Sequence, residues 1–129
     1  MAYRLAHTCL KVKNLAESLR FYTELLHMQE KGRVHIGDTV LVYLGDEGGS
    51  AHELELNYHP EHVGAYGLGE NPVHLAFAVD DYEKALALHR KAGCVKLELP
   101  QCGIHFLHDP DGYLIEILPQ QHFSLTERG

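Results

Sequence analysis

The sequence is poor in the features that mark secreted, membrane-bound or nucleic-acid-binding proteins. Its three cysteines have no CxxC spacing, so neither a disulfide framework nor a thiolate zinc site is indicated. No apolar run approaches the ~20 residues of a membrane-spanning helix, and the first ten residues lack the apolar core of a signal peptide. A formal net charge of -7, with no basic stripe, disfavours nucleic acid and anionic membranes as partners. We therefore expect a cytoplasmic protein with neither kind of partner.

What the sequence does have is an internal repeat and eleven histidines in 129 residues. Two stretches resemble each other: HTCLKVKNLAESLRFY from His7 and HLAFAVDDYEKALALH from His74. Each begins with His, has Val five residues later, and changes from strand-like alternation to helical spacing at a capping residue. The two copies begin about half a chain length apart, which indicates a duplicated unit. The excess of histidine invites a search for metal ligands.

Each copy predicts one helix that begins with a capping box. The first box consists of Asn14 and Glu17, and the second of Asp80 and Glu83. Gly93 suits the C-terminal end of the second helix. Each helix has one stripe of side chains to pack on a sheet: Leu15, Leu19, Tyr22 and Leu26 in the first, and Tyr82, Ala85, Leu86 and His89 in the second.

Three strands are predicted after each helix, which makes each half a β-α-β-β-β unit. Gly37-Asp38 and the GDEGGS loop are turns, and DPDG at 109–112 has Pro and Gly where a type I turn favours them. The expected strands span roughly 31–36, 39–44 and 52–58 in the first copy and 94–99, 103–108 and 113–118 in the second.

The sequence therefore predicts an α+β fold made of two βαβββ modules in a single domain, residues 1–129. Module one spans about 1–60 and module two about 73–120, with a linker rich in Gly and Pro at about 59–72. The C-terminal tail QQHFSLTERG contains no motif, and no function is assigned to it.

The strand GYLIEIL contains one carboxylate, Glu116, between Ile115 and Ile117. In a strand this carboxylate shares a face with two leucines, where it is costly unless it has a partner. Overlaying the two copies pairs Glu116 with Glu55 of HELELNY. The same overlay pairs the two histidines that begin the copies.

One His and one Glu from each copy, His7 with Glu55 and His74 with Glu116, can build a site of four ligands. Imidazole and carboxylate together favour a divalent transition ion such as Zn, Ni, Co or Fe, with coordination positions left for substrate. Other interpretations stay open at this point. His7 is also compatible with a hydrogen-bonded structural role and Glu55 with a solvated strand face, and Glu53 is an alternative ligand on the same side of the strand.

The motifs HTCLKV, SLRFYTELLHM, ELNY, HLAFAVDD and DPDGYLIEIL resemble those of the vicinal oxygen chelate superfamily and, within it, of the glyoxalase I (lactoylglutathione lyase) family. The resemblance implies paired βαβββ units that enclose one divalent metal ion, Ni or Co rather than Zn as in the short bacterial form. It implies a homodimer, with the site formed within one chain or across two. The implied reaction converts the hemithioacetal of methylglyoxal and a thiol, through an enediolate, into a 2-hydroxyacyl thioester.

The resemblance also implies roles for individual residues. The implied metal ligands are His7, Glu55, His74 and Glu116. Glu116 would loosen from the metal and act as the base. Glu55 would shuttle the proton or support the reaction of the other enantiomer of the substrate.

Two positions depart from the family pattern. Lys11 and His59 stand where many members have Arg and Asn for the glutathione carboxylates. Lys retains the positive charge but loses the two-pronged fit of Arg, which leaves the identity of the thiol open.

Three alternatives compete with a glyoxalase: an acyl-CoA epimerase, a dioxygenase, and a non-catalytic small-molecule binding protein. In the resembling families the epimerase typically has Gln where this chain has Glu55. The dioxygenases use two His and one Glu, and the binding proteins tend to lose the metal ligands. Glu55 is therefore the residue that discriminates among these functions.

Overall fold

The structure is a computed structural model in which residues 1–123 are described. The chain divides into two compact units, residues 1–67 and 68–129. Residues 124–129, the end of the tail to which the sequence gives no function, lie outside the described residues. Among residues 1–123, no helix combines the length and apolar character needed to cross a membrane. The cytoplasmic location stays a prediction.

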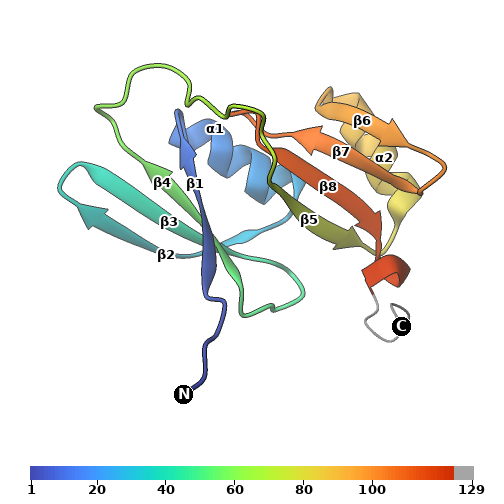
Figure 1. Cartoon of the computed structure of the whole chain (residues 1–129), viewed down its shortest axis with the longest axis horizontal. Helices are drawn as coiled ribbons and strands as arrows, with labels where there is room; N and C mark the ends of the chain where they lie inside the picture. The colour runs from blue at the N-terminus through green and yellow to red at the C-terminus, as the bar shows by residue number, and fades with distance from the viewer. Residues whose placement is uncertain (124–129) are drawn as a thin grey trace. The chain divides into compact units, whose positions relative to one another are not determined.

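The first unit is a four-stranded mixed sheet with one helix packed on it (Figure 1). The strands lie in the order β1-β4-β3-β2, with β1 parallel to β4 and the other pairs antiparallel. A parallel pair needs a long crossover, and the helix and hairpin between β1 and β4 provide it. The elements are β1 (His7–Val12), α1 (Leu15–Arg20), the π-helical turn η1 (Phe21–Leu25), β2 (Gln29–Ile36), β3 (Thr39–Gly45) and β4 (Glu53–Tyr58).

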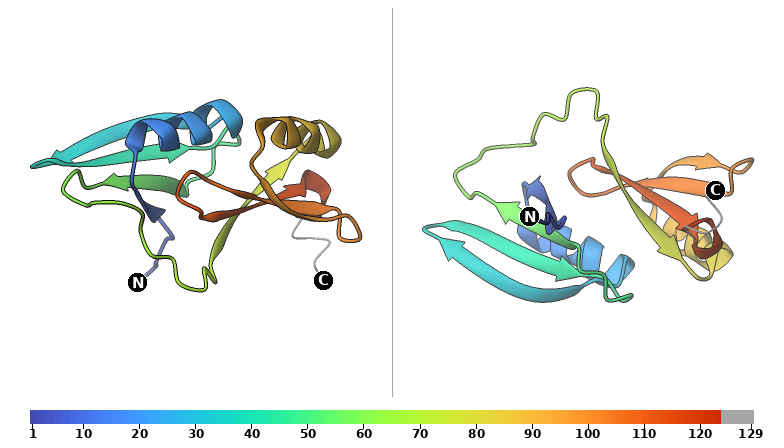
Figure 2. Two further views of the ribbon diagram at one scale, coloured as in Figure 1. Left: turned by 90° about the horizontal axis from the view of Figure 1, so that it is seen from above. Right: turned by 60° about the horizontal axis from the view of Figure 1, so that its bottom comes forward.

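The second unit repeats this topology, with the strand order β5-β8-β7-β6 and β5 parallel to β8. Figure 2 shows a helix on one face of each sheet. The α+β fold made of two repeated βαβββ modules is thereby confirmed. The elements are β5 (His74–Val79), α2 (Tyr82–Ala92), β6 (Val95–Leu99), β7 (Ile104–His108), β8 (Leu114–Pro119) and the 3-10 turn η2 (Gln120–Phe123).

Alternation along the strands sends one set of side chains of each sheet toward its helix and the other set to the opposite face. In the first unit the helix-facing set is the apolar core, to which α1 adds the fully buried Ser18 and η1 the fully buried Tyr22. The buried strand residues of this core are Leu10, Val12, Val42, Leu44, Leu54 and Leu56. In the second unit the corresponding buried strand residues are His105, Leu107, Ile115 and Ile117.

The capping prediction is right for the first helix and wrong for the second. The side chain of Asn14 accepts a hydrogen bond from Glu17 N, as expected. In α2, however, the N-cap is Asp81, which accepts from Lys84 N, and not Asp80. The reason is that β5 extends to Val79 and a bend at Asp80 precedes the helix.

The two helices also end differently at their C-termini. Gly93 ends α2 in the left-handed conformation with φ 76°, as predicted. The first helix instead changes to π-helical geometry after Arg20. Tyr22 of the predicted stripe is fully buried, while Leu15, Leu19 and Leu26 are half-buried.

The predicted turn at 109–112 is confirmed and has its own polar support. Gly112 N donates to Asp109 O, which closes the turn. Asp109 is buried, and its Oδ1 accepts from the backbone N–H of Asp111 and of Tyr113. These bonds fix the hairpin that carries the start of β8.

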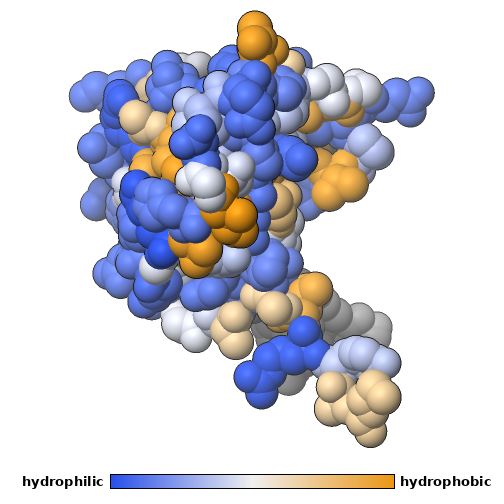
Figure 3. Space-filling view, turned by 90° about the vertical axis from the view of Figure 1, so that its left-hand side faces the viewer, coloured by the Kyte–Doolittle hydropathy of each residue, from blue (hydrophilic) through white to orange (hydrophobic). Residues whose placement is uncertain are grey.

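The molecular surface is mostly hydrophilic on the face shown in Figure 3, with separate hydrophobic patches. All residues of the edge strand β2 are exposed, including Val34 and Ile36. Hydrophobic residues are normal on protein surfaces when they occur singly.

Candidate functional site

The sheet face opposite α1 contains the polar residues singled out from the sequence in the first unit. Alternation from His7 and from Glu55 places them together, because β1 and β4 are neighbours in the sheet. The residues whose positions share this face are His7, Cys9 and Lys11 of β1, Glu53, Glu55 and Asn57 of β4, and Thr39, Leu41 and Tyr43 of β3.

His7 contacts Glu55 across the parallel strands. Nε2 of His7 lies 3.1 Å from Oε1 of Glu55. Glu53 is the in-register backbone partner of His7, yet the side chain of His7 pairs with Glu55. Glu55 is 6% exposed, so a solvated strand face does not describe its setting. Glu55, and not Glu53, is therefore the carboxylate that the His7 side chain contacts.

The Glu55 carboxylate is surrounded by hydrogen-bond donors. Asn57 Nδ2 donates to Oε2 at 3.1 Å, and Cys9 and Tyr43 are the in-register neighbours of Glu55 on the two adjacent strands. Burial raises the pKa of Glu55, but hydrogen bonding by Asn57, Cys9 and Tyr43 and the charge of His7 outweigh it, so the pKa lies below its usual value. The same group affects its neighbour: burial first, and then Glu55, raises the pKa of the Cys9 thiol to about 11.

In the second unit His74 contacts Glu116. Nε2 of His74 lies 3.0 Å from Oε1 of Glu116, whose side chain is 20% exposed. The carboxylate of GYLIEIL thus has the partner that its apolar strand requires. Its neighbours along the same face are Leu114 and Leu118, and the neighbour across β7 is Phe106.

Each unit therefore supplies one His–Glu pair with a ring nitrogen and a carboxylate oxygen about as far apart as two ligands on one ion. Imidazole and carboxylate fit a divalent transition ion. Among residues 1–123, no three His, Cys, Asp or Glu side chains form a metal-binding cluster. The structure brings each predicted pair together, and the joining of both pairs on one ion stays a prediction.

The two residues expected to bind the thiol lie in the first unit. Lys11 is exposed and shares the face of His7, and its charge acts on Cys9. His59 follows the last residue of β4, and its Nδ1 lies 3.1 Å from Thr39 Oγ1 and 3.4 Å from Glu61 Oε1. Neither role is tested by the arrangement of these side chains.

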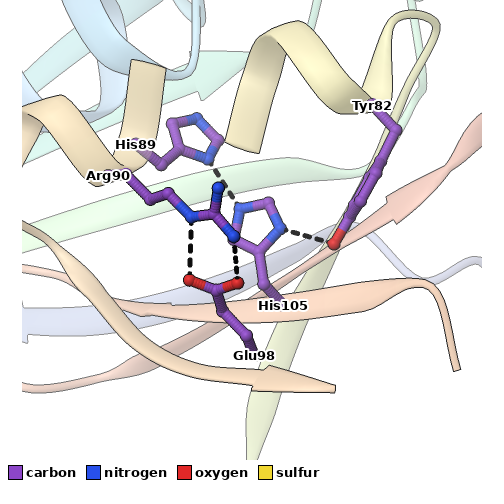
Figure 4. A network of polar contacts seen from close by, with 5 residues as sticks. All are labelled: Tyr82, His89, Arg90, Glu98 and His105. Carbon is purple, nitrogen blue, oxygen red and sulfur yellow. Dashed lines mark hydrogen bonds and ion pairs between the residues drawn. The ribbon is translucent and has the colours of Figure 1, made fainter. Parts of the chain in front are cut away.

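A second polar cluster, not anticipated from the sequence, lies between α2 and its sheet (Figure 4). His89 Nδ1 lies 2.8 Å from His105 Nε2, and His105 Nδ1 lies 2.8 Å from Tyr82 Oη. Both histidines are buried. Burial lowers the pKa of His89; burial and the neighbouring His89 lower the pKa of His105 to about 4. The helical pattern predicted that Tyr82 and His89 pack on the sheet. It could not predict that His105 of β7 is the residue they contact.

Beside this cluster an ion pair joins α2 to β6. Arg90 Nε donates to Glu98 Oε2 at 2.9 Å, and the guanidinium contacts both carboxylate oxygens (Figure 4). The hydrogen bond from Arg90 lowers the pKa of Glu98.

The sequence matches one family model and several known proteins over most of its length. The model of the glyoxalase/bleomycin resistance protein/dioxygenase superfamily matches residues 4–117. The chain is 35% identical, over 98% of its length and 97% of the relative, to a probable lactoylglutathione lyase of Vibrio parahaemolyticus. It is 36% identical to a lactoylglutathione lyase of Haemophilus influenzae, over 89% of this chain and 91% of the relative.

Among solved structures, the trypanothione-dependent glyoxalase I of Leishmania major is similar to this chain. The TM-score is 0.84 at 32% identity, covering 98% of this chain and 92% of that chain.

Proposed function

Because the chain belongs to the glyoxalase/bleomycin resistance protein/dioxygenase superfamily, we propose that it is a metal-dependent glyoxalase I. The resemblance in sequence motifs is confirmed at the level of the family. The relative at 35% identity is a probable lactoylglutathione lyase, and the relative at 36% identity is a lactoylglutathione lyase. The chain is thus a lyase in class. The proposed reaction converts the hemithioacetal of methylglyoxal and a glutathione-type thiol into a 2-hydroxyacyl thioester.

The observation that carries the proposal is the presence of a His–Glu pair at the equivalent place in both modules. His7 with Glu55 and His74 with Glu116 are the proposed ligands of one divalent ion. When bound, such an ion supplies positive charge beside oxygen atoms on which negative charge develops during the reaction. We expect Ni or Co rather than Zn, as the resemblance to the short bacterial form implies.

Glu116 is the proposed base. An unperturbed glutamate, with a pKa of about 4.3, is a weak base for a proton on carbon. Glu116 lies between the apolar Leu114 and Leu118 on the same face of β8, a setting that reduces the contact of its carboxylate with water relative to a free side chain. In the proposed cycle Glu116 takes the proton from C1 of the hemithioacetal and returns it to C2. The hydroxyl proton on the C1 oxygen passes to the C2 oxygen, so that C1 becomes the thioester carbonyl, C2 carries the hydroxyl, and no proton is gained or lost overall.

Lys11 is the proposed contact of a thiol carboxylate. It lies two residues after Cys9 on the face that holds His7, and its charge suits the carboxylates of a glutathione-type thiol. His59, held near Thr39, is the second proposed contact. A Lys11→Ala variant is expected to raise the KM for the hemithioacetal more than it lowers kcat, because this contact is the same in ground and transition states.

The experiment that tests the function is the formation of thioester from methylglyoxal and glutathione. Metal-free protein is loaded in turn with Ni, Co and Zn, and the assay is repeated with other cellular thiols. We expect turnover only in the loaded protein. An absence of turnover with every metal and thiol would contradict the proposal. Protein purified without chelator that neither contains nor binds metal would instead favour a binding protein.

We further propose a homodimer, as in the resembling family. Mixing inactive Glu55→Gln and Glu116→Gln proteins tests how the site is assembled. If one site takes its pairs from two chains, reassorted dimers regain about a quarter of the wild-type sites, because half of the dimers are mixed and each has one intact site. If both pairs come from the same chain, mixing restores nothing.

A further inference from the structure

The two glutamates of the His–Glu pairs occupy equivalent backbone positions but have opposite side-chain surroundings. In the sheet, each glutamate lies between two neighbouring strands. Glu55 of β4 is opposite Cys9 of β1 and Tyr43 of β3, and Glu116 of β8 is opposite Ala76 of β5 and Phe106 of β7. The backbone therefore offers both carboxylates the same setting, and any difference between them comes from these neighbours.

Around Glu55 the neighbours are hydrogen-bond donors. Asn57 Nδ2 donates to Oε2 at 3.1 Å. Tyr43 and Cys9, whose hydroxyl and thiol are able to donate, lie directly opposite Glu55 on the two neighbouring strands. The other oxygen, Oε1, lies 3.1 Å from His7 Nε2. Donors that hold a ligand carboxylate fix its orientation, and they resist its displacement.

Around Glu116 the equivalent neighbours are hydrocarbon. Ala76, Phe106 and Leu118 replace the thiol, the phenol and the amide, and none of these side chains can donate a hydrogen bond. The Glu116 carboxylate contacts the side chain of His74, with Nε2 3.0 Å from Oε1.

In both modules an aromatic ring packs edge to face against the histidine. The two modules therefore differ at this position by the hydroxyl alone. His7 and Tyr43 meet edge to face with ring centres 5.7 Å apart, and His74 and Phe106 meet in the same way at 5.2 Å. An aromatic ring thus lies beside each histidine, whereas of these two rings only the one opposite Glu55 carries a hydroxyl.

We propose that Tyr43 and Asn57 are positioning residues that hold Glu55 as a fixed metal ligand, whereas Glu116 keeps the freedom to leave the ion and act as the base. This inference rests on the proposed function. It assigns the division of labour between two carboxylates to particular side chains that differ between the modules.

The test removes the donors from module one without removing the ligand. Tyr43→Phe and Asn57→Leu give Glu55 the residue types that surround Glu116. We expect each to raise the Kd for Co(II), measured by competition with a chromophoric chelator, about tenfold. We also expect the visible absorption of bound Co(II) to shift, because the carboxylate changes its orientation. Tyr3→Phe, which removes a hydroxyl from an exposed residue of the same unit, is the matched control and should change neither.

The reciprocal variant adds a donor to module two. Phe106→Tyr places a hydroxyl beside Glu116 at the position equivalent to Tyr43. Because one charged hydrogen bond then opposes the release of Glu116, we expect kcat to fall about tenfold, while Co(II) binds at least as tightly as in the wild type. A kcat equal to that of the wild type would overturn the freedom assigned to Glu116.

The two readouts separate this inference from the proposed function. Co(II) affinity and spectrum in Tyr43→Phe and Asn57→Leu that match the wild type overturn the positioning role, whatever the activity. A wild type that binds Co(II) but forms no thioester overturns the glyoxalase reaction, while the affinity series still decides whether Glu55 is held. A wild type that binds no metal overturns both.

Discussion

Nε2 of His7 lies 3.1 Å from Oε1 of Glu55, although the backbone partner of His7 in the parallel ladder is Glu53. The choice between the two glutamates could not be made from the strand HELELNY, in which both point to the same face. The structure separates them by burial: Glu55 is 6% exposed, and Glu53 is half-buried.

Glu55→Gln should therefore weaken metal binding strongly, and Glu53→Gln should not. Loss of one anionic ligand from a site of four is expected to raise the Kd for Ni or Co at least tenfold, because the amide carries no charge to balance the ion. Titration of metal-free protein with each ion measures this directly. An equal loss of metal affinity in the two variants would contradict the assignment of Glu55, rather than Glu53, as the ligand.

Glu116→Gln is expected to reduce kcat by about a hundredfold or more at saturating metal, because an amide cannot accept the proton from carbon. Saturation with metal separates this loss from weakened binding of the ion. Glu70→Gln, an exposed carboxylate of the same unit, is the matched control and should retain wild-type kcat. Full activity in Glu116→Gln would remove Glu116 from the role of base.

The sequence predicted the pairing of histidines with glutamates because the repeat relates them and strand alternation sets their faces. It could not predict the donors around Glu55. Tyr43 and Asn57 are ordinary strand residues in the sequence, and their function as neighbours of Glu55 depends on which strands pair and in what register. The same limit explains the missed contact between His89 and His105, which lie on different elements.

The wrong N-cap of the second helix shows a different limit. Asp80 and Asp81 are adjacent and chemically identical, so residue preference alone does not choose between them. The repeat does contain the signal, because the offset that relates His7 to His74 also relates Asn14 to Asp81. Boundaries are the part of a helix that propensity defines least well.

Asp81→Ala should cost about 1 kcal/mol of unfolding free energy, since Lys84 N loses its acceptor. Asp80→Ala should change the free energy by less than about 0.5 kcal/mol, as is usual for an exposed residue without such a role. Urea denaturation of both variants measures the difference. The reverse order of the two losses would contradict the assignment of the cap.

The buried chain of Tyr82, His89 and His105 should make stability depend on pH. Two neutral imidazoles share a hydrogen bond, because one nitrogen donates and the other accepts, but two protonated rings present donors to each other. The groups that face His105 are Tyr82, His89 and Arg90 of α2 and Glu98 of β6, whereas its backbone partner in β8 is the apolar Ile117.

The direction follows from the lowered pKa of His105, which is about 4 in the folded protein, against about 6.5 in an unfolded chain. Below about pH 6.5 the unfolded state binds the proton more readily, so the stabilisation is fully present above that pH and is lost as the pH falls toward about 4. At about pH 5 the loss is on the order of 2 kcal/mol.

We expect His105→Gln to lose less stability than the wild type between about pH 7.5 and about pH 5, because the amide does not titrate. Urea unfolding at the two pH values gives this difference for each protein, so that a general destabilisation by the substitution cancels. His108→Gln, on the same strand but exposed, is the matched control and should keep the pH dependence of the wild type. If His105→Gln also keeps it, the acid sensitivity arises from groups other than this buried pair.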